Sequence, residues 1–162
     1  MNYIQSLTND FFDSLSACDI SHLNLAQICE KKGIVCFESN LSSNIYGYIE
    51  ESNNKTHIRI NSDLPSNQKE ISIASLLSMH ILNISRNEEK VYINSSNLKI
   101  FNNYYNLALS ILFTKKIKDR TLSLDTLNSL KNMDCNYFKL NKITEISKRT
   151  NISLPHVFNY LN

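Results

Sequence analysis

The chain has only two glycines and two prolines among its 162 residues. Tight β-turns depend on these residue types, because Gly adopts positive φ without strain and Pro presets the turn. Their scarcity argues against an all-β fold with many turns and favours helices. A chain of this length buries about 68–70% of its unfolded surface on folding, which is enough for an unaided core. We therefore expect one helix-rich domain spanning residues 1–162.

Composition excludes several classes of protein. With 42% hydrophobic and 20% charged residues, the chain is neither collagen-like nor strongly charged and disordered. It has no apolar run near the roughly 18–20 residues of a membrane span, and residues 1–13 do not resemble a secretory signal. We expect a soluble cytoplasmic protein without membrane contact. Its cysteines form no C-x-x-C pair of the kind that binds zinc, and we expect them to stay reduced: Cys18, Cys29, Cys36 and Cys135.

Hydrophobic periodicity predicts the secondary structure. Apolar residues recur at helical spacing over residues 3–18, 23–32, 65–84, 101–114, 122–130, 140–149 and 153–161. Short β-branched or alternating runs predict strands at 34–38, 45–50 and 56–61. Gly33 predicts a left-handed stop after the second helix, and the helix from Pro65 is apolar nearly all round, as a central helix is. The predicted class is α+β, mostly helical, with a small three-stranded sheet packed on a central helix.

Charge is unevenly distributed along the chain. Residues 1–114 contain 8 Lys and Arg against 11 Asp and Glu, whereas residues 115–162 contain 9 against 4. A basic C-terminal third is compatible with an acidic partner or nucleic acid. A solvated helical face rich in lysine is the more ordinary explanation.

Six segments, in order along the chain, carry a family resemblance. They are LAQICEKKGI at 25–34, NIYGY at 44–48, NKTHIRINSDLP at 54–65, KEISIA at 69–74, NLALSIL at 106–112 and KITEISKRTNISLPHVF at 142–158. Together they resemble the ImmA/IrrE family of zinc metallopeptidases. The resemblance implies a zincin-like minimal domain with an N-terminal helix at 1–20, a core at 21–116 and a C-terminal helical subdomain at 117–162.

In that family, two histidines at positions i and i+4 of a helix hold zinc, and a glutamate between them activates water. The corresponding positions here are Ser75, Leu76, Leu77, Ser78 and Met79. A shift by one residue brings His80 into the second histidine position but restores nothing else. The family's third ligand is a carboxylate on a later helix, yet residues 93–118 contain no Asp or Glu. We therefore expect no catalytic residues, no metal and no cofactor.

The chain resembles the family but lacks the residues of the family's active site. We therefore expect a pseudoenzyme that still binds a protein. Active relatives act on repressors in phages and integrative elements, so the expected function is a regulator. An antirepressor or a protein inhibitor from a phage or other mobile element would bind a repressor or another regulatory protein. Tyrosine is favoured at interfaces, and the candidate partner-binding residues are Tyr46, Tyr48, His80, Tyr104 and Tyr105. The alternative explanation is that the tyrosine rings fill the space left by the missing zinc site. A single histidine without other ligands nearby is likewise more often a core residue than a binding residue.

The last two predicted helices form a pair that resembles a helix-turn-helix, with a turn at Asn151. If the pair binds DNA as a transcriptional regulator, its candidate contacts are Lys148, Arg149, His156 and Asn159. Few basic groups are available to meet phosphates, so packing on the rest of the domain is the favoured role. DNA binding through this pair remains the alternative function.

Overall fold

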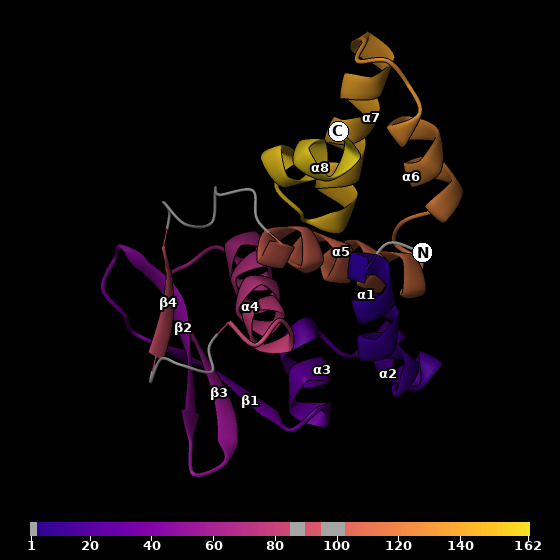
Figure 1. Ribbon diagram of the computed structural model, residues 1–162. Helices are drawn as coiled ribbons and strands as arrows, with labels where there is room; N and C mark the ends of the chain where they lie inside the picture. The colour runs from indigo at the N-terminus through magenta and orange to yellow at the C-terminus, as the bar shows by residue number, and fades with distance from the viewer. Residues whose placement is uncertain (1–2, 85–89, 95–102) are drawn as a thin grey trace.

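The structure is a computed structural model that describes residues 3–84, 90–94 and 103–162. Helices pack against one side of a four-stranded sheet, and the C-terminal helices lie on the far side of those helices (Figure 1). The predicted α+β class is confirmed. The helices are α1 (Tyr3–Asp13), α2 (Ala17–His22), α3 (Leu25–Lys31), α4 (Ser66–Ile81), α5 (Asn103–Lys118), α6 (Leu124–Lys131), α7 (Tyr137–Thr150) and α8 (Leu154–Leu161). The strands are β1 (Ile34–Ser39), β2 (Ile45–Ser52), β3 (Lys55–Asn61) and β4 (Lys90–Asn94).

The sheet has the strand order β1-β3-β2-β4. Strands β1 and β3 run parallel, and β2 runs antiparallel to both β3 and β4. The prediction of three strands is therefore incomplete, because β4 adds a fourth. Ile93 of β4 is fully buried opposite Gly47, which explains why so short a strand is held in the sheet.

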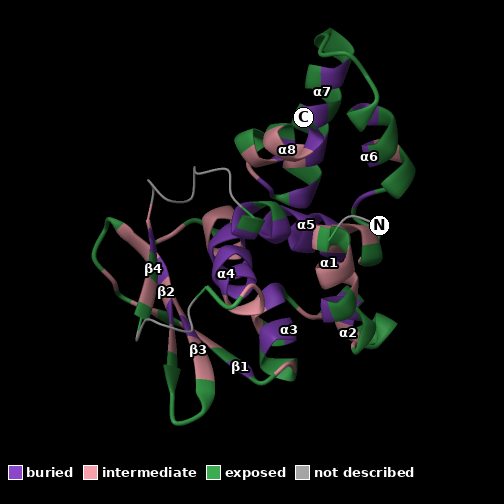
Figure 2. Cartoon of the chain, viewed as in Figure 1, coloured by how far each residue is buried: buried purple, intermediate pink, exposed green. Residues whose placement is uncertain are grey.

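Helix α4 is the centre of the fold, as its apolar sequence predicts. Every residue from Ile71 to Met79 is buried, because the helix packs on β2 and β3 on one side and on α5 on the other (Figure 2). Gly47 permits the close approach of the sheet to this helix. A Cβ atom at Gly47 would lie 2.6 Å from the carbonyl oxygen of Arg59 and 3.2 Å from Cδ1 of Leu76.

The prediction of one helix over residues 3–18 is wrong. The chain forms α1 and α2 instead, and the Ser16 hydroxyl begins the second helix by accepting a hydrogen bond from the backbone N–H of Asp19 at 3.0 Å. The apolar stripe continues across the break, so periodicity alone does not reveal it. Gly33 has a φ of 78°, which confirms the predicted left-handed position after α3.

Helix α8 packs on α5, and α6 and α7 pack on α8. The ring of Tyr160 in α8 stacks on Phe113 of α5, with centroids 4.0 Å apart. Helix α7 ends at Asn151, which has a left-handed φ of 56°. The expected boundary between the core and the C-terminal helical subdomain, at residues 116 and 117, lies within α5. In the described part of the chain, no helix has the length and apolarity needed to cross a membrane.

Candidate functional site

Residues 75–79, which the predicted resemblance aligns with a zinc motif, lie in the buried interior, where α4 packs on the sheet and on α5. Ser75, Leu76, Leu77 and Ser78 have no exposed surface, and Met79 is almost as buried. The two hydroxyls are satisfied within the helix, since Ser75 donates to the carbonyl of Ile71 and Ser78 to that of Ala74, each at 2.7 Å. This segment therefore has no side chain free to hold a ligand.

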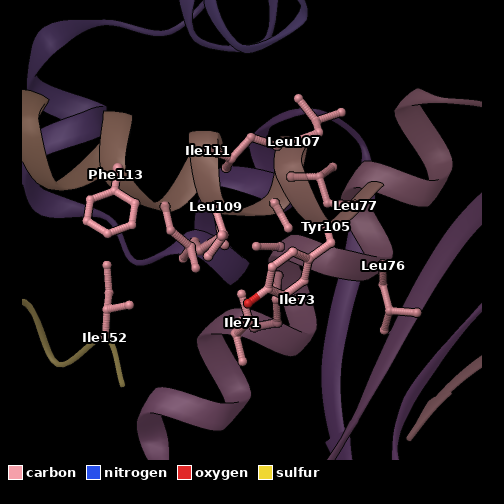
Figure 3. Close-up of a cluster of buried hydrophobic side chains, with 14 of the residues drawn as sticks. Ile71, Ile73, Leu76, Leu77, Tyr105, Leu107, Leu109, Ile111, Phe113 and Ile152 are labelled. Atoms are coloured by element: carbon pink, nitrogen blue, oxygen red, sulfur yellow. The ribbon is translucent and has the colours of Figure 1, made fainter. Parts of the chain in front are cut away.

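The facing side of α5 is equally apolar. Figure 3 shows side chains of α4 and α5 in one buried hydrophobic cluster, among them Leu76, Leu77, Leu107, Leu109 and Ile111. All of these are buried. Such close packing contributes to stability through area removed from water and through dispersion contacts. The α4–α5 interface is the core of the protein.

Tyr104 and Tyr105 lie at the start of α5 and are both buried. The hydroxyl of Tyr105 is 2.6 Å from Nδ1 of His156 in α8. Burial raises the pKa of Tyr105 and lowers the pKa of His156. Both shifts favour the neutral forms, so the two rings share a hydrogen bond between uncharged groups.

His80 lies at the C-terminal end of α4 and is half-buried. Its Nδ1 is 3.6 Å from Oε1 of Glu51 on β2, an ion pair that forms when the imidazole is protonated. Over residues 3–84, 90–94 and 103–162, no three His, Cys, Asp or Glu side chains gather in a way that could hold a metal ion.

The structure does not bring the five predicted partner-binding residues together. Tyr46 and Tyr48 are half-buried on β2, where the ring of Tyr48 lies 5.2 Å from that of Tyr92 on β4. His80 is at the end of α4, and Tyr104 and Tyr105 are covered on α5. The four predicted tyrosines are thus divided between the sheet and the core.

The four candidate DNA contacts also face different surroundings. Lys148 and Arg149 are exposed at the end of α7. His156 is directed toward Tyr105 of α5, and Asn159 lines a cavity of about 230 Å³ next to the same helix. Two of the four residues therefore lie between α8 and α5.

The sequence interpretation missed a groove between α6 and α7, which has a volume of about 680 Å³. Its apolar part is formed by Leu130, Met133 and Phe138. Helix α7 contributes residues at helical spacing, one turn apart and on one side: Phe138, Asn141, Lys142 and Glu145. The predicted helix began at residue 140, and this late start left Phe138 outside the helical pattern.

Most residues that line the α6–α7 groove are exposed, whereas Leu130 is buried. The exposed parts of α6 and α7 are green in Figure 2. Phe138 is 72% exposed and its neighbour Tyr137 is 73% exposed, although only Phe138 lines the groove. Asp125 and Glu145 place carboxylates along it. Glu145 accepts a hydrogen bond from Lys142 at 2.8 Å, and this bond lowers the pKa of the carboxyl group.

No protein-family model matches this chain, and no curated protein matches it significantly. The resemblance to the ImmA/IrrE family therefore stays a prediction from the six sequence segments.

Proposed function

We propose that this protein is a non-catalytic regulator that binds another protein through the α6–α7 groove. The observation that carries the proposal is the groove itself, with Phe138 standing 72% exposed beside Met133 and Leu130. Exposed apolar surface bordered by polar residues is typical of protein interaction sites. Full burial of one such side chain by a partner contributes about 1.5–3 kcal/mol.

The shape and charge of the groove indicate the kind of partner. Two helices form its walls, and a hydrophobic groove of this kind accepts the apolar face of an amphipathic helix. Asp125 and Glu145 add negative charge beside the apolar surface, which favours a partner helix with a basic residue near its apolar side chains. A repressor or another regulatory protein is the expected partner class, with the chain acting as an antirepressor or protein inhibitor.

The interior of the protein supports a role without catalysis. The α4 segment from Ser75 to Met79 consists of buried apolar side chains and of two serines whose hydroxyls donate to backbone carbonyls of the same helix. A general base or a metal ligand would have to replace buried Leu or Met there. Regulation by binding requires no such group.

The proposal is tested with two neighbouring variants used as bait. Phe138→Ser removes an apolar side chain from the groove, and Tyr137→Ser removes one of equal exposure outside it. After crosslinking in the native cell, we expect wild type and Tyr137→Ser to retain a stoichiometric partner that Phe138→Ser loses. The same recovery with all three baits, or no partner with wild type, would contradict the proposal.

DNA binding through α7 and α8 is the second candidate. It is favoured by the excess of basic residues over residues 115–162 and by exposed Lys148 and Arg149. Gel-shift experiments on a Lys148→Ala/Arg149→Ala variant test it. Affinity that falls steeply with salt and is lost in this variant would support the second candidate over the first.

A further inference from the structure

The face of the sheet that points away from α4 has a continuous row of large side chains. Phe37 on β1 pairs with Arg59 on β3, Arg59 pairs with Tyr48 on β2, and Tyr48 pairs with Tyr92 on β4. Side chains alternate between the two faces of a strand, and Gly47 faces Leu76 of α4, so its neighbour Tyr48 faces outward. The helices drawn as ribbons in Figure 1 all lie on the other side of the sheet.

Two cations contact the aromatic rings of this row. The guanidinium of Arg59 lies 4.1 Å from the centroid of the Phe37 ring and 6.0 Å from that of Tyr48. The Tyr48 and Tyr92 rings are 5.2 Å apart, and Nζ of Lys90 is 5.3 Å from the Tyr48 ring. Cation–π contacts of this kind hold flat rings and positive charge at one surface.

One carboxylate lies beside the row. Glu50, in the next pair of positions along β2, is 3.5 Å from Nε of Arg59 and 3.3 Å from Nζ of Lys90. The face therefore has two cations and one anion in direct contact, which leaves an excess of positive charge. Arg59 is partly open to solvent, and Tyr92 is 45% exposed. An incoming ligand can reach both kinds of group.

We propose that this row, Phe37, Arg59, Tyr48 and Tyr92 together with Lys90, binds single-stranded nucleic acid. Unpaired bases stack on aromatic side chains presented by a sheet, while Arg and Lys meet the phosphates. The charge of the face is complementary to that of a polyanion, and the rings offer flat apolar surface to bases. This site is separate from both the α6–α7 groove and the α7–α8 helix pair.

The test is fluorescence anisotropy of labelled single-stranded oligonucleotides of about twelve nucleotides, with a duplex of the same sequence as competitor. We expect saturable binding of the single strand that weakens with salt and is poorly competed by the duplex. Tyr92→Ala removes a partly exposed stacking surface and is expected to weaken binding at least about fivefold. Glu50→Gln removes the competing carboxylate and is expected to strengthen binding.

The Lys118→Ala/Arg120→Ala variant is the matched control, since it removes two exposed cations at and just after the end of α5, outside the row and outside both sites of the proposed function. It is expected to bind the single strand as wild type does. Absence of binding by wild type, or equal binding by wild type and Tyr92→Ala, would overturn the proposal. Loss of binding in the control variant alone, or equally tight binding of the duplex, would also overturn it, and thermal melting establishes that each variant is folded.

Discussion

The hydroxyl of Tyr105 in α5 lies 2.6 Å from Nδ1 of His156 in α8, and this hydrogen bond fastens the C-terminal helix to the core. His156 is mostly enclosed, and its burial lowers its pKa. The contact is therefore sensitive to protonation of the imidazole. It connects the stability of the whole chain to pH.

Stability is predicted to fall in mildly acidic solution. Because the pKa of His156 is lowered on folding, the unfolded state binds its proton first as the pH falls below the ordinary value of about 6.5. The stabilisation is fully present above that value and is lost as the pH falls through the folded-state pKa. Urea unfolding across this range measures it. His156→Gln should show a weaker pH dependence, and an unchanged dependence would exclude His156 as the group responsible.

Lys115 is predicted to contribute strongly to stability. Its ammonium is buried and donates to the carbonyl of Ile20 at 3.0 Å and to the carboxylate of Asp119 at 3.1 Å. Lys115→Ala leaves both acceptors without this donor, and we expect a loss of about 3 kcal/mol in the free energy of unfolding.

The exposed pair of Lys142 and Glu145 provides the control for that measurement. Lys142→Ala should cost less than about 1 kcal/mol, because exposed ion pairs contribute little. Equal losses for the two alanine variants in denaturant unfolding would show that Lys115 is not held in a buried network.

The two glycines are predicted to respond differently to alanine. At Gly47 an added Cβ meets the backbone carbonyl of Arg59 on β3 at 2.6 Å and Cδ1 of Leu76 on α4 at 3.2 Å, so β2 must shift against both its neighbouring strand and the helix. Overpacking of this kind costs about 1–3 kcal/mol. At Gly33 nothing lies within 4 Å, and the cost of Gly33→Ala comes from its φ of 78° alone.

Asparagine distinguishes these two causes, because it tolerates left-handed backbone better than alanine does. Gly33→Asn should therefore be more stable than Gly33→Ala in thermal melting. At position 47 the larger asparagine side chain should be worse than alanine. The opposite order at either position would contradict the assignment.

The four cysteines are predicted to differ in reactivity. Cys18 and Cys135 are exposed and should be alkylated first under native conditions. Cys29 is buried beside Cys36, and the hydrogen bond with the Cys36 thiol together with burial raises the pKa of Cys29. Since the thiolate is the nucleophile, Cys29 should react last. Peptide mass mapping after timed alkylation gives the order, and early modification of Cys29 would contradict it.

Features of the fold are predictable from the sequence where the residues of a single helix or strand determine how that element is buried or how it ends. The apolar run from Ile71 predicts a central helix, because a helix with few polar sides must be covered all round. The positive φ of Gly33 follows from its place after a helical stripe. The break at Ser16 was missed because apolar spacing continues through it. Strand β4 was missed because five residues give too few repeats to establish a period.

The surfaces were harder to predict than the core. Periodicity assigns residues to a side of an element, but it does not say which elements meet. Tyr48 was identified as a candidate, whereas its cross-strand neighbours Arg59 and Tyr92, and Phe37 on the far side of Arg59, join it in a group only through the pairing of four strands. The α6–α7 groove likewise depends on how two helices lie against each other.

Glu50 has one more consequence for the outer face of the sheet. A carboxylate shared between Arg59 and Lys90 is a built-in competitor that any incoming anion must displace. A mononucleotide or free phosphate, with one point of attachment, competes poorly against a group tethered at high local concentration. A long chain with several attachments at once competes well. Discrimination by ligand length would then arise from a single acidic side chain.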